Sequence, residues 1–223
     1  MDWVALALSL KLATATLVVL FPVGVWLGRL LAWREFRGKA VLEAALTLPL
    51  VLPPTVLGYY LLVGLGGASP PGALYQQFTG RQLVFSFEGL LIASIVFNLP
   101  FAIQPMQRAF EAISQDVRDA ADCCGLSRWR RLWRIELPLA WPGVLSALVL
   151  TFAHTLGEFG VVLMVGGNIP GETKTIAIAI YDRVQAFDNA AAGFMSAVLL
   201  LITLLAITAT FVTGRRGGRS RGV

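Results

Sequence analysis

The segment LATATLVVLFPVGVWLG, residues Leu12–Gly28, contains seventeen residues without a charge and decides the class of fold. With its flanks it forms an apolar stretch from about residue 4 to residue 31, longer than the roughly 20 helical residues that cross a bilayer. The whole chain of 223 residues is 57% hydrophobic and 14% charged, whereas soluble domains carry about 25% charged residues. This composition excludes soluble enzymes, disordered chains and collagen-like chains, and it predicts a membrane protein.

Four further apolar segments are long enough to span a membrane, at about Leu42–Gly66, Gly89–Gln107, Trp141–Val165 and Ala190–Gly214. We therefore predict an all-α, polytopic membrane protein with five transmembrane helices. The first segment is expected to be an uncleaved span rather than a signal peptide, because it starts with an acidic residue, is interrupted by Lys11 and shows no small-residue cleavage site.

Basic residues gather on one side of this five-span arrangement. Of the 18 lysines and arginines, four lie at 29–39, six at 108–134 and four at 215–221. By the positive-inside rule, these three segments are cytoplasmic, so the N-terminus is predicted outside and the C-terminus in the cytoplasm. A nucleic-acid partner is excluded despite the net charge of +5, because the basic residues are divided among three loops.

The two predicted outer segments differ in character. Residues 67–80 are rich in glycine and proline and are expected to be a loop, whereas residues 166–189 are expected to include a short outer helix. The only cysteines, Cys123 and Cys124, are adjacent and do not have the spacing of a zinc site or a disulfide framework. We expect no phosphate-binding loop, metal site, cofactor or catalytic centre, so the chain is not expected to be an enzyme.

Ionisable residues are nearly missing inside the predicted spans. His154 and Glu158 are four residues apart, which would place them on one face of a helix. They are either a hydrogen-bonded packing pair or candidate pathway or gate residues, because charges within a membrane are costly and usually face an interior or water. Five spans do not divide into repeated halves, so any transport would draw its energy from another subunit, and the narrow bundle predicts a homodimer.

The strongest signal is the inner loop SQDVRDAADCCGLSRWRRLWRIELPLAWPG, residues Ser114–Gly143. It is predicted to form two short helices joined by Gly125, the first capped by Ser114 and the second running from about Arg128 to Ile135 and stopping before Pro138. The loop could lie on lipid head groups as a basic amphipathic element. Alternatively, the small Ala120 and Ala121 could let another protein approach the first helix closely.

Part of this loop, DAADCCGLSRWRRLWRIELP, resembles the EAA loop of ABC-type importer permeases, E-A-A-x3-G-x9-I-x-L-P. Asp119 stands where that family usually has glutamate, and the remaining matches are Ala120, Ala121, Gly125, Ile135, Leu137 and Pro138. The resemblance implies that residues 1–223 form one transmembrane domain and that its cytoplasmic loop, 108–140, docks into a separate ATPase subunit. It also implies an extracytoplasmic binding protein and a bacterial or archaeal inner membrane.

Two other segments, LPLVLPPTVLGYYLL (48–62) and TLGEFGVVLMVGGNIPGETKTIAIAIY (155–181), resemble molybdate permeases within this family. The resemblance implies import of molybdate, with tungstate as a second substrate and selectivity residing mainly in the binding protein. Sulfate permeases are the first alternative, since they share L-G-E-F-G, although they are usually longer and often carry arginine at the position of His154. A non-transporting membrane scaffold that recruits a cytoplasmic partner is the alternative from another class.

Overall fold

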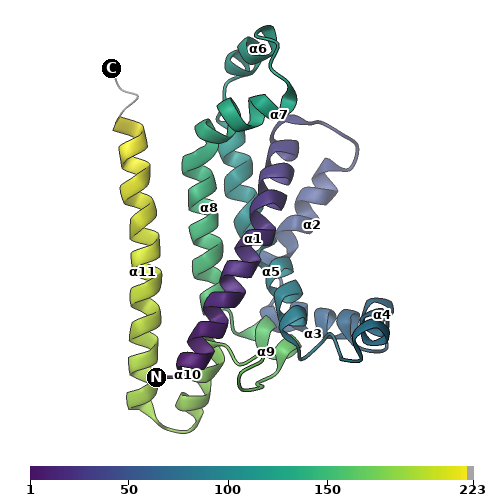
Figure 1. Ribbon diagram of the computed structural model, residues 1–223, viewed down its shortest axis with the longest axis vertical. Helices are drawn as coiled ribbons and strands as arrows, with labels where there is room; N and C mark the ends of the chain where they lie inside the picture. The colour runs from purple at the N-terminus through teal and green to yellow at the C-terminus, as the bar shows by residue number, and fades with distance from the viewer. Residues whose placement is uncertain (220–223) are drawn as a thin grey trace.

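The computed structural model describes the backbone of residues 1–219 and the side chains of residues 1–208, and every regular element in that range is helical. Four long helices run roughly along the long axis of the molecule (Figure 1). They are α1 (Trp3–Trp33), α5 (Phe87–Glu111), α8 (Leu137–Gly157) and α11 (Asn189–Arg219). All four are long and apolar enough to cross a membrane, which confirms four of the predicted spans. The basic residues at 215–221 lie outside the described side chains.

The second predicted span is broken. The helices α2 (Lys39–Val51) and α3 (Pro54–Leu65) meet at an angle of 112°, and only as a bent pair do they supply a fifth span. Leu52 is extended at ψ 139° between them. The cause is the pair Pro53–Pro54, because proline lacks an N–H and the residue before a proline disfavours the helical region. The predicted span over Leu42–Gly66 is therefore a bent pair of helices rather than one straight helix.

The short elements gather at the two ends of the bundle (Figure 1). At one end lie α6 (Gln115–Cys123), α7 (Arg128–Arg131) and the last turns of α11. At the other end lie the start of α1 and three short helices: α4 (Pro70–Thr79), α9 (Gly160–Gly166) and α10 (Ile176–Gln185). Helix α10 confirms the short helix predicted within 166–189. Helix α4 corrects the expected loop at 67–80, and Ser69 caps it by accepting a hydrogen bond from Gly72 N at 3.2 Å.

The centre of the bundle is the packing of α1, α5 and α8. Met106 and Phe110 of α5 are fully buried against Val144 of α8. The helices approach each other at glycines: a Cβ on Gly28 would lie 3.0 Å from the backbone nitrogen of Gln107. Small residues at such crossings let helix backbones pack closely in a membrane. This packing fixes α1, α5 and α8 relative to one another, so the segments at their ends are held in place.

Candidate functional site

The predicted docking segment projects from one end of the bundle as helix α6 and the turn that follows it (Figure 1). Gly125 has a φ of +68°, which confirms the left-handed turn that ends this helix. Ser114 occupies the N-cap position, but its side chain makes no capping hydrogen bond, so the expected cap is absent. Cys123 and Cys124 are free thiols and exposed. The turn that ends α6 therefore rests on the left-handed backbone of Gly125, while the start of the helix lacks a side-chain cap.

The residues of the EAA-like pattern divide between the surface and the interior. Four of them are exposed, namely Asp119, Ala120, Gly125 and Pro138, whereas Ile135 is half-buried. Ala121 is only 3% exposed and Leu137 7%, so these two side chains pack within the chain. The expectation that both alanines contact another protein is therefore wrong for Ala121, which is buried. Ala120 is exposed, next to Asp119, and could still contact a partner.

The second helix of the loop does not stop before Pro138, as the sequence had suggested. Helix α7 passes into a π-helical turn, η1 (Leu132–Glu136), which continues directly into α8. Within this turn the Leu137 N–H bonds the Leu132 carbonyl, an i→i−5 contact. Pro138 is the second residue of α8, so the backbone N–H that it lacks falls directly after the π-helical turn. The loop is consequently joined to α8 without a flexible break, and π-helical turns are often found at functional sites.

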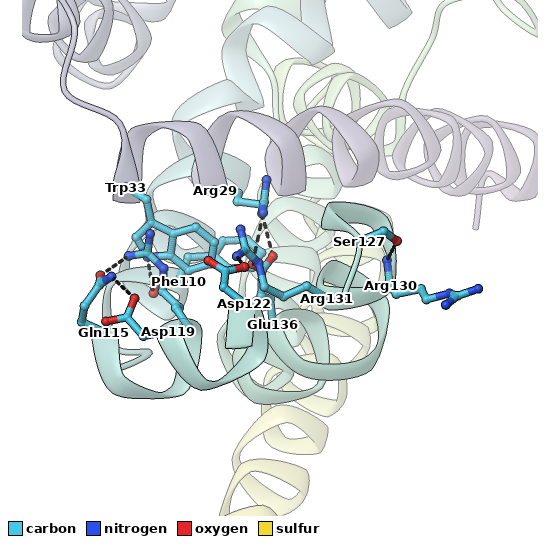
Figure 2. Close-up of polar contacts among 11 residues, drawn as sticks. Arg29, Trp33, Phe110, Gln115, Asp119, Asp122, Ser127, Arg130, Arg131 and Glu136 are labelled. Atoms are coloured by element: carbon cyan, nitrogen blue, oxygen red, sulfur yellow. Dashed lines mark hydrogen bonds and ion pairs between the residues drawn. The ribbon is translucent and has the colours of Figure 1, made fainter. Parts of the chain in front are cut away.

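A chain of ion pairs connects α6 to the membrane helices (Figure 2). Glu136, whose side chain is 0% exposed, accepts hydrogen bonds from Arg29 of α1, with Nε at 2.6 Å and Nη2 at 3.1 Å. The same carboxylate accepts from Arg131 Nε at 2.8 Å, and Arg131 Nη1 in turn pairs with Asp122 of α6. Two arginines and two carboxylates therefore balance in charge and join α1, η1 and α6.

A second contact fixes the other side of α6. The guanidinium of Arg118 lies 4.3 Å from the ring of Trp33, the last residue of α1. The Trp33 indole also donates to the Phe110 carbonyl at 3.2 Å, and Gln115 donates to Asp119 at 2.7 Å (Figure 2). Helix α6 is thus held against the ends of α1 and α5. Sequence reasoning missed these contacts, although the isolated glutamate within RIELP was a signal for a buried partner.

A different polar cluster lies deep among the membrane helices. The Asn98 amide donates to the Ser94 carbonyl at 2.9 Å and to Glu158 Oε2 at 3.4 Å, while its Oδ1 lies 2.9 Å from His154 Nδ1. The Ser94 hydroxyl is 3.4 Å from the same Glu158 oxygen and receives a hydrogen bond from Thr16. Asn98, Ser94 and Thr16 are all 0% exposed, as expected for polar groups that satisfy one another within a bundle.

His154 and Glu158 do not share a helix face, contrary to the sequence-based expectation. Helix α8 ends at Gly157, and Glu158 is extended at ψ 127° before α9 begins. The predicted fourth span, Trp141–Val165, is therefore shifted, since the apolar helix is Arg128–Gly157 and α9 is separate. Asn98 of α5 bridges the two side chains instead. The Glu158 Oε1 atom is buried without a hydrogen-bond partner.

A polar cavity of about 380 Å³ opens between α2 and α5. Gln107 donates to Glu43 at 3.1 Å and to Glu111 at 3.0 Å, and Gln104 donates to Thr47 at 3.1 Å. Polar side chains on membrane helices generally face a protein interior or water rather than lipid. This cavity, at the end of the bundle that carries α6, therefore marks a face that water or another protein subunit covers.

Comparison with known proteins gives consistent results. The family model described as "Binding-protein-dependent transport system inner membrane component" matches residues 21–216. The molybdenum transport system permease protein ModB of Azotobacter vinelandii is 44% identical over 214 residues, which cover 96% of this chain and 95% of that protein. A probable sulfate transport system permease protein of Chlorella vulgaris is 33% identical, over 78% of this chain and 65% of that protein.

Solved structures show the same architecture. The chain resembles a bacterial ABC transporter involved in the import of the acidic polysaccharide alginate, with a TM-score of 0.76 and 17% sequence identity. The match covers 96% of this chain and 78% of that one. At this level of identity the likeness establishes a shared fold.

Proposed function

Because this chain belongs to the family of binding-protein-dependent transport system inner membrane components, we propose that it is the permease subunit of an ATP-driven molybdate importer. The observation that carries the proposal is the 44% identity to a molybdenum transport permease over nearly the full length of both chains. The sulfate permease is less similar and extends well beyond the matched region, which favours molybdate over sulfate. Tungstate, an oxyanion of the same charge and shape, is the expected second substrate.

The proposed assembly contains two copies of this chain, two ATPase subunits and an extracytoplasmic binding protein in a bacterial or archaeal inner membrane. The polar cavity lined by Glu43, Gln104 and Gln107 supports pairing, because a second copy could cover it without exposing these groups to lipid. The family description itself names dependence on a binding protein. With the N-terminus outside and the C-terminus in the cytoplasm, α6 would lie on the cytoplasmic side of this assembly and α10 on the outer side.

The ion-pair chain provides a physical route from the ATPase to the membrane helices. We propose that the exposed Asp119, Ala120 and Gly125 contact the ATPase, so that its motion displaces α6. Asp122 and Arg131 would carry that displacement to Glu136, which is continuous with α8 and is bonded to Arg29 of α1. Since Glu136 joins both helices, they would move together rather than independently. The rigid connection through η1 prevents the loop from absorbing the motion.

The buried polar cluster bears on how the anion passes. Glu158 is surrounded by Asn98 and Ser94, and no lysine or arginine contacts it among the described residues. A dianion would find no fixed positive charge there, so a tight site at this depth is not expected. Selectivity would then reside mainly in the binding protein, and the permease would supply a weakly binding passage with His154 and Glu158 as candidate gate residues.

Uptake by the reconstituted complex tests the proposed substrate. Vesicles containing the permease, its ATPase and its binding protein should accumulate labelled molybdate when ATP is present. Unlabelled tungstate should compete strongly and sulfate weakly. Stronger competition by sulfate would move the assignment to sulfate import. Absence of ATP-dependent uptake of all three anions, with the ATPase still bound, would favour the membrane scaffold.

Co-purification of the ATPase tests the docking surface. Gly125→Val should lose the ATPase, because its φ of +68° is costly for a β-branched residue, and Ala120→Glu should lose it through bulk. Asp119→Glu restores the usual family residue and should be nearly silent, whereas Asp119→Lys should uncouple ATP hydrolysis from uptake. Ala121→Glu is a poorer probe, since Ala121 is buried within the chain. Full ATPase retention by both Gly125→Val and Ala120→Glu would contradict docking at α6.

A further inference from the structure

A largely apolar cavity of about 510 Å³ lies between α1 and the segment that joins α7 to α8. Its floor is built from Val25, Leu132 and Leu137, which belong to the bundle core. Its rim carries Trp26 and Trp129, which are 64% and 68% exposed. The volume is within the range of about 300–1,000 Å³ that is common for small-molecule sites.

Positive charge borders the same cavity. Arg128 lines it and is exposed, and in the part of the chain that the structure describes it forms no ion pair. Arg130 and Arg134 follow on the same short segment and are likewise exposed and without a carboxylate partner in the described part. Figure 2 shows the side chain of Arg130 extending away from the cluster around Glu136. The free cations are thus distinct from Arg29 and Arg131, which are already paired.

We propose that this cavity binds an anionic phospholipid, with an acyl chain against Val25 and Leu137 and the phosphate beside Arg128. Basic pockets between membrane helices on the cytoplasmic side suit acidic head groups, and exposed tryptophans favour the membrane–water boundary. Val25 of the floor lies eight residues before the end of α1, which places it about 12 Å below that end at 1.5 Å per residue. That depth corresponds to acyl chain beneath a head group.

The observations favour lipid over the other occupants of an apolar groove. A second copy of the chain meeting this face symmetrically would bring two clusters of unpaired arginines together, which like-charge repulsion opposes. A water-soluble partner such as the ATPase would reach the arginines but not the floor at the depth of Val25. An acidic lipid complements both the cationic rim and the apolar floor.

Tryptophan quenching by brominated lipids tests the proposal. The full-length chain, with and without its ATPase, is reconstituted in phosphatidylcholine vesicles that contain a small, equal fraction of either brominated phosphatidylglycerol or brominated phosphatidylcholine. In the wild type the brominated anionic lipid should quench more strongly than the zwitterionic one. The combined Trp129→Phe and Trp133→Phe variant should lose most of that difference, because these residues lie nearest the free arginines.

Matched arginine variants assign the head-group contact. Arg128→Gln should weaken the relative affinity for the anionic lipid about five-fold, the contribution of one cation near an acidic surface. Arg128→Lys should retain the preference. Arg134→Gln is the control, because Arg134 lies on the same segment but does not line the cavity. Equal lipid preference in Arg128→Gln, Arg134→Gln and the wild type, or no preference in the wild type, would overturn the proposal. Loss of quenching by both lipids on ATPase binding would instead identify a protein occupant and would also overturn it.

Discussion

Two buried carboxylates, Glu136 at the end of the bundle and Glu158 deep within it, have opposite surroundings. Glu136 is held by two guanidinium groups, with nitrogen–oxygen distances of 2.6 and 2.8 Å. Among the side chains that the structure describes, only the neutral Ser94 and Asn98 approach Glu158, each at 3.4 Å, and none pairs with its second oxygen. One carboxylate is therefore fully compensated and the other is weakly held.

The two kinds of surroundings support different proposed roles, a connection between helices for Glu136 and a gate position for Glu158. A buried ion pair with good geometry ties helices together, and removing one partner leaves uncompensated charge. A buried polar group with incomplete hydrogen bonding lowers stability and calls for an explanation such as a functional role. By this comparison, Glu136 joins α1, η1 and α6, whereas Glu158 is weakly held at the break between α8 and α9, which supports its proposed role as a gate residue.

The same substitution at both carboxylates gives the largest expected contrast. Glu136→Gln removes the buried charge that the half-buried Arg29 and Arg131 share, and breaking a buried ion pair costs about 3–5 kcal/mol. We expect the variant to be strongly destabilised and to lose the ATPase from the purified complex. Equilibrium unfolding of the detergent-solubilised permease measures the first effect, and co-purification measures the second.

Glu158→Gln serves as the matched control for that experiment, since the substituted group is the same size and is also buried. A loss of stability at position 136 no larger than that at position 158 would contradict the distinction between the two sites. Arg29→Gln should resemble Glu136→Gln in direction but be milder, because Arg131 would remain paired with the carboxylate.

The next largest effect is expected from removing the Asn98 side chain, which bridges His154 and Glu158. Asn98→Ala leaves the acceptor Glu158 and the ring of His154 without their shared partner. Leaving a buried polar group unpaired costs about 1–3 kcal/mol, so the unfolding free energy should fall by that amount. Gln104→Ala, which removes one hydrogen bond in the more open cavity beside Thr47, provides a control. A change at position 98 that is no larger than the one at position 104 would show that the bridge does not stabilise the bundle.

Much of this architecture was predictable from the sequence, because apolar length and turn-forming residues act locally along the chain. The four long apolar helices, the short helix within 166–189 and the left-handed turn at Gly125 follow from such local rules. The two consecutive prolines at the break, Pro53 and Pro54, are visible in the sequence, but the predicted span was based on the apolar character of the whole segment. Helix α4 escaped notice because its glycines and prolines suggested a loop, although Ser69 followed by prolines is typical of a helix start.

The candidate site was only half predictable. The EAA-like pattern identified the exposed Asp119 and Ala120 as candidates through resemblance. The partners Arg29 and Glu136 are 107 residues apart, and no local pattern relates them. Similarly, the four-residue spacing of His154 and Glu158 suggested a shared face only because a continuous helix was assumed. Tertiary packing and the end of α8 at Gly157 decide both arrangements.

Glu158→Gln tests whether this weakly held carboxylate has the proposed role in transport. Its stability should change by less than about 1 kcal/mol, because the amide can still accept from Ser94 and Asn98. The complex should remain assembled, but molybdate uptake per ATP hydrolysed should change, since the charge at the helix break is gone. His154→Gln, on the other side of the Asn98 bridge, should alter the same ratio. Uptake and ATP hydrolysis at wild-type levels in both variants would assign the cluster to packing alone.

The smallest effect is expected at a partly exposed ion pair, Lys174–Asp182, which provides a reference near the surface for both buried carboxylates. Burial alone would raise the pKa of Asp182, but hydrogen bonds from Lys174 and Asn168 outweigh it and hold the pKa below its ordinary value of 3.8. A carboxyl group with a lowered pKa stabilises the fold above its unfolded value, and that contribution is lost as the pH falls through the folded value.

Asp182→Asn should therefore destabilise the permease by at most about 1 kcal/mol at pH 7, as solvent-exposed pairs do. The difference from the wild type should stay constant down to about pH 5, shrink below pH 4, and weaken at pH 7 in 1 M salt. Unfolding curves that differ equally at pH 7 and pH 3 would show that Asp182 acts through packing rather than through its charge.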